Sequence, residues 1–215
     1  MKVIVFGGSG SAGGSVLRAC LNAPEVTQVR AIIRRPLRLA HEKLQVFRHN
    51  DYVNYTPVED AFTDVDACLF CLGISSTQVT AEQYRIISYD FPLAAARKLQ
   101  MHSPTALFHY ISGQGTNLNS RFAWARVKGA TERDLIALAG AVCWRPSIIN
   151  GEPSESAPRL YQAMRPLFRL LKPFRNLYVD GQDLGRAMLQ TTKENVRGRI
   201  IENAEIREIA SRYDK

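Results

Sequence analysis

The 215-residue sequence contains no uncharged hydrophobic run as long as the roughly 18–20 residues that a membrane-spanning helix requires. It has only four cysteines, too few for a disulfide scaffold in a chain of this length. A signal peptide is not expected either, because the first predicted strand starts at residue 2. These features together predict a cytoplasmic protein with no membrane span.

Cys68 and Cys71 have the spacing of a redox or metal-binding pair, but their surroundings argue against that chemistry. They lie in the apolar segment Val65–Leu72, which is typical of a buried strand. Residues three apart on a strand point to opposite faces, so the two thiols would not converge on one ligand. We therefore interpret both as structural residues and predict no metal site.

The charge balance, 28 basic against 20 acidic residues, gives a net charge of +8 and indicates an anionic partner. Between residues 30 and 48 only Glu42 opposes a cluster of six basic residues: Arg30, Arg34, Arg35, Arg38, Lys43 and Arg48. No stacking aromatic platform or recognised nucleic-acid motif accompanies them. We therefore expect no nucleic acid, and a phosphorylated cofactor explains part of the cluster more simply.

Short apolar runs alternate with helical patterns along the chain, which predicts an α/β fold with a doubly wound parallel sheet of the Rossmann type. The predicted strands are Val3–Phe6, Val29–Ile33, Gln45–Phe47, Ala67–Leu72, Thr105–Ile111 and Ala141–Trp144. Helices are expected over Ala12–Leu21, Ala81–Leu99 and Phe122–Ala139, with a kink at Pro92.

The pattern changes after residue 150. We assign residues 1–150 to a cofactor-binding core and residues 151–215 to a small helical cap that also completes the sheet, within one domain. The cap includes Arg159–Arg175, which mixes basic and apolar residues and contains no acid. We favour a cover over the substrate cleft for this segment, and a docking surface for a protein partner is the alternative.

The most informative motif is the glycine-rich turn at residues 7–14, which lies between the first strand and the first helix. Glycines allow a tight turn and a close approach to a pyrophosphate, whose charge then meets the free amides of the helix N-terminus. The strand before the turn and the helix after it supply the context that this motif needs. The predicted cofactor contacts are Gly7, Ser9, Gly10, Ser11, Ala12 and Gly13.

The end of the second strand indicates which dinucleotide is bound. NAD sites usually place an acidic residue there, whereas this strand ends in Arg34 and Arg35. Two guanidiniums would bind a 2′-phosphate that a carboxylate would repel, so the sequence predicts NADP(H). Asp51 is a candidate for the adenine end, and Leu72 and Gly73 end the fourth strand where ligands meet such a sheet.

The ordered series of motifs resembles the short-chain dehydrogenase/reductase superfamily. It looks most like the atypical group that includes the HIV Tat-interacting oxidoreductase-like and flavin-reductase-type proteins. The resemblance rests on the glycine spacing, the arginine pair and four later segments: Cys71–Gly73, Ile111–Gly113, Val127–Gly129 and Arg145–Ser147. It covers residues 1–150 well and the remainder loosely.

The resemblance implies roles for particular residues. Ser112 matches the serine that holds the substrate carbonyl, and Lys128 matches the lysine that binds the nicotinamide ribose. Pro146 and Ser147 match a turn beside the nicotinamide. The position of the proton-exchanging tyrosine, four residues before the lysine, is Trp124. Because an indole N–H does not exchange protons at neutral pH as a phenol does, the usual carbonyl-reduction chemistry is in doubt.

Two functional interpretations stay open. The first is an NADP-dependent oxidoreductase that passes hydride to a small acceptor, namely a flavin, a quinone or a carbonyl compound. In that case solvent, or one of Tyr110, His109 and Tyr84, would supply the proton. The second is an NADPH-sensing protein with little or no turnover. The resemblance also leaves open a homodimer, because helices packing about a two-fold axis are common in the family.

Overall fold

The structure is a computed structural model that describes residues 1–37, 39–153, 167–174 and 176–213. Its centre is a seven-stranded parallel sheet with the strand order β3-β2-β1-β4-β5-β6-β9. The strands are β1 (Lys2–Phe6), β2 (Gln28–Ile33), β3 (Leu44–Arg48), β4 (Ala67–Phe70), β5 (Leu107–Ile111), β6 (Val142–Arg145) and β9 (Ile200–Glu202). The predicted doubly wound Rossmann fold is thereby confirmed.

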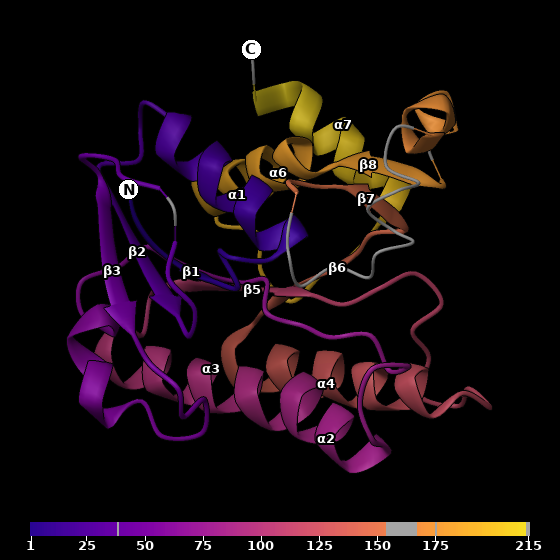
Figure 1. Cartoon of the computed structure of the whole chain (residues 1–215), viewed down its shortest axis with the longest axis horizontal. Helices are drawn as coiled ribbons and strands as arrows, with labels where there is room; N and C mark the ends of the chain where they lie inside the picture. The colour runs from indigo at the N-terminus through magenta and orange to yellow at the C-terminus, as the bar shows by residue number, and fades with distance from the viewer. Residues whose placement is uncertain (38, 154–166, 175, 214–215) are drawn as a thin grey trace.

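Helices cover both faces of the sheet, as Figure 1 shows. One face carries α1 (Ser11–Asn22), α6 (Gly181–Lys193) and α7 (Asn203–Tyr213). The opposite face carries α2 (Ala81–Arg85), α3 (Phe91–His102) and α4 (Ala123–Ala139). The 3-10 helix η1 (Thr56–Phe62) packs against α3 on this second face. The 3-10 helix η3 (Arg169–Leu171) comes between β7 and β8 in the chain.

The central strand β1 shows why the sheet needs helices on both sides. Val3 and Val5 pack into the core under α1, α6 and α7, whereas Ile4 and Phe6 pack into the core under α3 and α4. Alternate residues of a strand point to opposite faces, and here both sets are fully buried. An unbroken apolar run therefore becomes a strand between two hydrophobic layers.

The C-terminal part of the chain adds the edge strand β9, which pairs with β6 in parallel. A separate two-stranded sheet joins β7 (Ile148–Asn150) to β8 (Tyr178–Asp180). Residues 154–166 and 175 lie outside the described residues, and they include most of the predicted Arg159–Arg175 segment.

The helix predicted over Ala81–Leu99 is a helical run from α2 to α3 that contains the π-helical turn η2 (Ile86–Asp90). Pro92 has no N–H, so the carbonyl four residues earlier, that of Ser88, loses its usual helical donor. This carbonyl accepts hydrogen bonds from the Tyr110 hydroxyl at 3.0 Å and from the Thr131 hydroxyl at 2.9 Å. Side-chain hydroxyls from β5 and α4 thus supply hydrogen-bond donors to this carbonyl of the helix.

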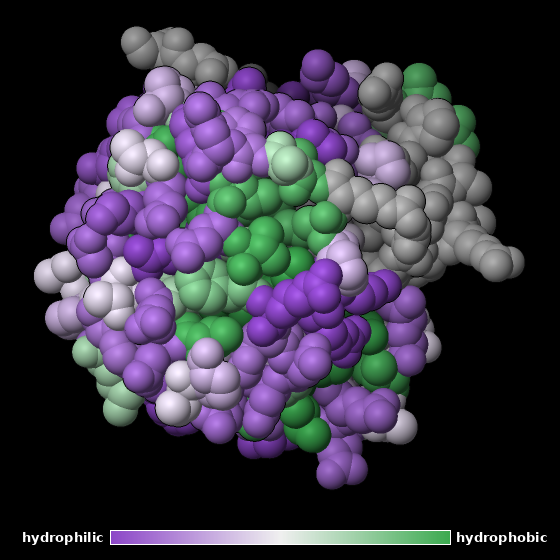
Figure 2. All heavy atoms as spheres, turned by 60° about the vertical axis from the view of Figure 1, so that its left-hand side comes forward, coloured by the Kyte–Doolittle hydropathy of each residue, from purple (hydrophilic) through white to green (hydrophobic). Residues whose placement is uncertain are grey.

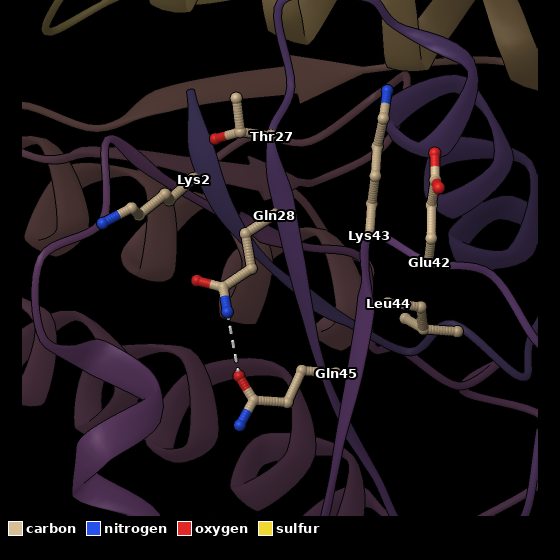
Figure 3. A pocket seen from close by; sticks show the side chains of 7 residues that line it. All are labelled: Lys2, Thr27, Gln28, Glu42, Lys43, Leu44 and Gln45. Carbon is tan, nitrogen blue, oxygen red and sulfur yellow. Dashed lines mark hydrogen bonds between the residues drawn. The ribbon is translucent and has the colours of Figure 1, made fainter.

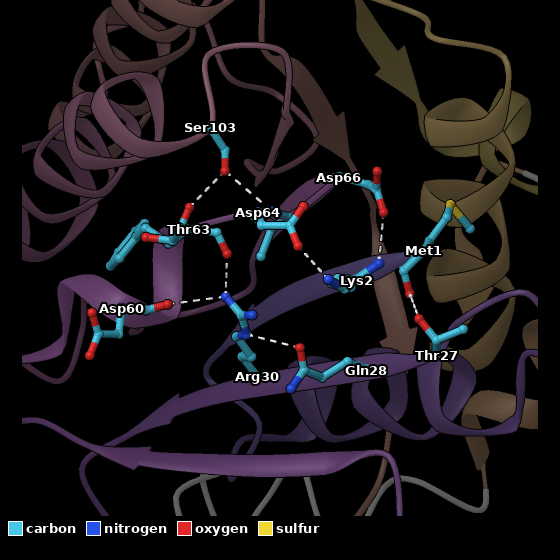
Figure 4. A network of polar contacts seen from close by, with 12 residues as sticks. Met1, Lys2, Thr27, Gln28, Arg30, Asp60, Thr63, Asp64, Asp66 and Ser103 are labelled. Carbon is cyan, nitrogen blue, oxygen red and sulfur yellow. Dashed lines mark hydrogen bonds and ion pairs between the residues drawn. The ribbon is translucent and has the colours of Figure 1, made fainter.

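A polar network ties the amino-terminal parts of β1 and β2 to neighbouring loops (Figure 4). The Arg30 guanidinium donates to the main-chain carbonyl oxygens of Asp60 and Ala61, at 3.1 and 3.2 Å. The Ser103 hydroxyl donates to the carbonyl of Phe62 at 2.8 Å and accepts from the amide of Val65. Arg30 therefore belongs to the fold and not to a free basic surface.

No helix among the described residues is long and apolar enough to cross a membrane. Figure 2 shows one face of the molecule, where hydrophobic residues gather in the middle and hydrophilic residues surround them.

Candidate functional site

A cleft of about 810 Å³ opens at the carboxyl ends of the central strands. Ligands bind at this edge of open α/β sheets, beside the point where the strand order reverses. Here the order reverses between β1 and β4, and both strands end at the cleft. Four segments supply most of its wall, residues 7–13, 32–35, 71–75 and 147–149, and Ile87 and Phe91 add to it.

The glycine turn forms one wall, and two of its glycines cannot be replaced without a clash. Gly7 has a φ of +75°, and a Cβ there would lie 2.8 Å from the carbonyl oxygen of Cys71. A Cβ on Gly13 would lie 2.2 Å from the carbonyl oxygen of Gly7. The turn closes with a hydrogen bond of 2.8 Å from the Gly10 amide to that same carbonyl. Close contact between strand and helix therefore sets the shape of this wall.

The N-terminus of α1 points its first turn at the cleft, which Ser11, Ala12 and Gly13 line. The first amides of a helix have no intrahelical acceptor, and this turn contains no acidic side chain that would compete with an anion. The Ser11 hydroxyl is shielded from solvent and has no hydrogen-bond partner within the described part of the chain. It lies against Gly151, where an added Cβ would come within 2.5 Å of it.

Arg34 and Arg35, at the end of β2, line the cleft and are exposed. Among the described lining residues there is no Asp or Glu. The part of the cleft beside the end of β2 is therefore positively charged, and this charge suits a second phosphate group.

The predicted adenine contact Asp51 does not line the cleft. Its carboxylate accepts hydrogen bonds from the amides of Val53 and Asn54, at 3.1 and 3.2 Å, and so caps its own turn. The neighbouring residues Asn50 and Tyr52 do line the cleft. Leu72 and Gly73 lie where the sequence places them, at the cleft wall after β4.

Lys128 on α4 reaches the cleft from the far side. Its ammonium donates to the main-chain carbonyls of Ser112 at 2.7 Å and Ile111 at 3.2 Å, and lies 5.5 Å from the centre of the Tyr110 ring. Burial disfavours the charged form and lowers the pKa of Lys128 to about 8, while the Glu132 carboxylate acts in the opposite direction.

Three other predicted site residues are not brought to the cleft wall. Ser112 is buried, and its hydroxyl shares a hydrogen bond of 3.1 Å with that of Thr116. Trp124 is half-buried in the first turn of α4 and Pro146 is buried, and neither lines the cleft. Ser147 does line it, and its amide donates to the Asn203 side chain at 2.8 Å.

The alternative proton donors named from the sequence are also absent from the described cleft wall. His109 is fully buried between the Trp144 indole, which donates to its Nδ1 at 3.2 Å, and the Thr192 hydroxyl at 2.9 Å from its Nε2. Burial lowers the pKa of His109 to about 3. Tyr110 and Tyr84 are buried as well, and burial raises the pKa of each phenol.

Sequence reasoning missed much of the apolar wall, which Ile74, Ile87, Phe91, Ile111, Ile148 and Ile149 form together. Cys71, which the sequence indicates to be a structural residue, packs against the core and also lines the cleft. Such residues have the same pattern as core positions, so only the fold could reveal them. The described residues contain no cluster of His, Cys, Asp or Glu that could hold a metal ion.

A second hollow, of about 640 Å³, lies at the amino ends of β1, β2 and β3 (Figure 3). The side chains of Gln28 and Gln45 point toward each other there and share a hydrogen bond of 3.1 Å. The Lys43 ammonium donates to the carbonyl of Ala23 at 2.9 Å, and Lys2 forms an ion pair with Asp64. Because its lysines are engaged elsewhere, this hollow is a weaker candidate site than the cleft.

Comparison with known proteins adds two findings. No protein-family model matches the chain. Among curated proteins, the chain is 29% identical over 167 residues to "Protein fmp52, mitochondrial" of Aspergillus clavatus, covering 73% of this chain and 70% of that protein. It is 22% identical over 215 residues to "Protein FMP52, mitochondrial" of Candida albicans, covering 93% and 91%.

Solved structures share the fold. MoeE5 in complex with UDP-glucose and NAD matches with a TM-score of 0.71 and 15% identity, over 94% of this chain and 75% of that one. WbmF of Bordetella bronchiseptica in complex with NAD+ matches with a TM-score of 0.69 and 13% identity, over 99% and 77%.

The comparisons correct one prediction. Relatives from several fungi carry names that place them in mitochondria, which contradicts the cytoplasmic location expected from the sequence. The expectation rested on composition and on the position of the first strand, which carry no information about import into an organelle. The finer resemblance to Tat-interacting and flavin-reductase-type proteins stays a prediction.

Proposed function

We propose that the cleft binds NADP(H) and that the protein is an oxidoreductase that transfers hydride to a small acceptor. The observation that carries the proposal is the pairing of the glycine turn with Arg34 and Arg35 in one cleft whose described wall holds no carboxylate. The helix N-terminus would hold the pyrophosphate, and the two guanidiniums the 2′-phosphate. Leu72 and Gly73 would contact the adenosine half, while Asn50 and Tyr52 take the place assigned to Asp51.

At the other end of the cleft, Lys128 and Ser147 would hold the nicotinamide half, beside Ile111, Ile148 and Ile149. Bound NADPH supplies a hydride. The neighbouring wall is apolar and lacks the serine and tyrosine pair of a carbonyl reductase, because Ser112 bonds to Thr116 and residue 124 is tryptophan. This favours a quinone or a flavin as acceptor over a carbonyl compound.

Direct titration with NADPH and NADH tests the cofactor assignment. We expect NADPH to bind at least tenfold more tightly, and Arg34→Glu or Arg35→Glu to abolish most of that difference. A charge-assisted hydrogen bond contributes about 1.5–3 kcal/mol, which corresponds to roughly 10–150-fold in affinity. Arg48→Glu is the matched control, because Arg48 is exposed and does not line the cleft. Equal affinity for the two nucleotides would contradict the proposal.

The second candidate function is an NADPH sensor without turnover. Trp124 and the engaged Ser112 hydroxyl favour it, because a sensor needs the cofactor site but no acid. NADPH oxidation measured with FMN, menadione, 9,10-phenanthrenequinone and 4-nitrobenzaldehyde separates the two. Tight NADPH binding with no oxidation by any of the four would support the sensor.

A further inference from the structure

The cleft contains few side chains that could give up a proton. Among the described lining residues, the ionisable groups are Arg34, Arg35, Tyr52, Cys71 and Lys128. The arginines and Tyr52 belong to the β2–β3 end, and arginine does not deprotonate in proteins. Burial raises the pKa of the Cys71 thiol well above its usual value. Lys128 is the one that comes from α4 and reaches the end of β5.

We propose that Lys128 delivers the proton that accompanies hydride transfer, in the role that a phenol would have if residue 124 were tyrosine. This inference rests on the proposed oxidoreductase function and assigns its proton donor. It makes Lys128 a catalytic residue in addition to a ribose-binding one.

Hydrogen-bond geometry supports this role. An ammonium has three N–H donors, and two of those of Lys128 are directed to the carbonyls of Ile111 and Ser112. Those bonds fix Nζ at the carboxyl end of β5, at the cleft wall. No further acceptor is recorded for Nζ within the described residues, so the third N–H is available to a bound molecule.

The charged surroundings of Lys128 come from three elements. Tyr110 on β5 presents its ring face, and Cys143 on β6 carries a neutral thiol whose pKa burial raises. Glu132, one helical turn along α4, forms an ion pair of 2.7 Å with Arg145, so its charge is largely compensated. With burial dominant, the pKa of Lys128 falls to about 8, close to the range in which general acids work best.

The step balances without another reactant. The acceptor gains a hydride from the cofactor and a proton from Lys128; an N–H bond of the ammonium breaks and an O–H or N–H bond of the reduced acceptor forms. Lys128 is left as a neutral amine, which regains a proton from water. With a quinone as acceptor, the product is a hydroquinone.

The first test uses the protein without cofactor. Trace acetylation followed by mass spectrometry gives the pKa of each lysine amine from the pH dependence of its labelling. We expect Lys128 to titrate near 8, and its labelling to be suppressed when NADPH is added. A titration midpoint near the ordinary value of 10.5 would overturn the proposal.

The second test follows NADPH oxidation by 9,10-phenanthrenequinone between pH 6 and 10. We expect the wild-type kcat to fall about tenfold per pH unit above 8, because the donor is lost as it deprotonates. Lys128→Arg keeps the charge but cannot give a proton, so NADPH affinity should stay within about threefold while kcat falls about 100-fold or more. In Lys128→Ala, added methylamine should restore part of the rate.

The outcomes separate the two levels of the proposal. An arginine variant that keeps both rate and pH profile would overturn proton delivery by Lys128 and leave the oxidoreductase function intact. NADPH binding without turnover on any acceptor would overturn both proton delivery and hydride transfer. Failure of the wild type to bind NADPH would overturn the cofactor assignment itself.

Discussion

The hydroxyl of Tyr110 lies 3.0 Å from the main-chain carbonyl oxygen of Ser88, and this contact fixes the role of the tyrosine. The phenol donates to a carbonyl whose usual helical donor, the N–H four residues later, is missing at Pro92. It is therefore a structural donor on the side of the sheet that α3 and α4 cover, and its proton is already engaged. A tyrosine that looks like a spare acid in the sequence is in fact part of the helix packing.

Replacing Tyr110 by phenylalanine should lower stability without affecting the cleft. We expect Tyr110→Phe to reduce the free energy of unfolding by about 1 kcal/mol, since Thr131 still donates to the same carbonyl. Tyr55→Phe is the matched control, because the Tyr55 hydroxyl is buried and has no partner among the described residues. That variant should be neutral or slightly more stable. Urea denaturation measures both, and equal losses would contradict the assignment.

The contact between Gly13 and Gly7 predicts a severe effect of a single methyl group. Gly13→Ala would place a Cβ 2.2 Å from the Gly7 carbonyl oxygen, so α1 must move away from β1. We expect a lower Tm and at least a tenfold loss of NADPH affinity. Gly113→Ala is the control, because nothing lies within 4 Å of the Cβ it would add. If both variants bind NADPH like the wild type, the turn is not the pyrophosphate site.

Arg145 pairs with two carboxylates that differ in burial, which provides an internal comparison. The Glu132 side chain is 3% exposed and that of Glu202 is 56% exposed. Removing one partner of a buried pair leaves an uncompensated charge, so Glu132→Gln should cost about 3–5 kcal/mol. Glu202→Gln should cost less than about 1 kcal/mol. Thermal and urea unfolding of the two variants show which one loses more stability. Equal losses, or a larger loss for Glu202→Gln, would mean that Glu132 has only a surface role.

The buried His109 predicts a pH dependence of stability. Its pKa is lowered to about 3 in the fold from a usual 6.5, because burial disfavours the imidazolium. Between these two pKa values, the imidazole of His109 is therefore protonated in the unfolded chain and neutral in the folded chain. The stabilisation is complete above pH 6.5 and is lost as pH falls toward 3, by up to about 1.4 kcal/mol per pH unit.

Unfolding free energies between pH 7 and 4 test this dependence. His109→Gln should flatten the slope, because glutamine has no proton to gain yet keeps a donor and an acceptor for Thr192 and Trp144. His41→Gln serves as the control, since the His41 ring is only half-buried. A slope that is unchanged in the His109 variant would mean that other groups account for the acid sensitivity.

Much of the fold could be predicted from the sequence because local residue patterns indicated where strands and helices begin and end. The apolar run from Val3 to Phe6 followed by the glycine turn defined the first strand and helix. Arg34 and Arg35 lay in the cleft as expected, because the end of β2 leaves little choice of position. Pro92 marked the place where the helix changes. The local sequence does not show the π-helical turn itself, or that Tyr110 and Thr131 donate to the Ser88 carbonyl within it.

The site was harder to predict where the direction of a side chain decides whether it lines the cleft. Ser112 follows β5 as expected, yet its hydroxyl turns to Thr116 and stays out of the cleft wall. Asp51 was the predicted adenine contact, but its carboxylate caps its own turn, and the residues on either side of it line the cleft instead. A shift of one position along a loop changes which side chain reaches the ligand, and no periodicity fixes it.

The position of Asn203 has a consequence for how the protein is made. Its side chain joins the Ser147 amide at the cleft to the carbonyl of Tyr178, and it directly follows the edge strand that pairs with β6. The proposed nicotinamide end of the site is therefore incomplete until residue 203 has been synthesised and β9 has paired with β6. A chain that stops before residue 203 would keep the proposed phosphate-binding half of the cleft but lack the side chain that holds the Ser147 amide at the other half.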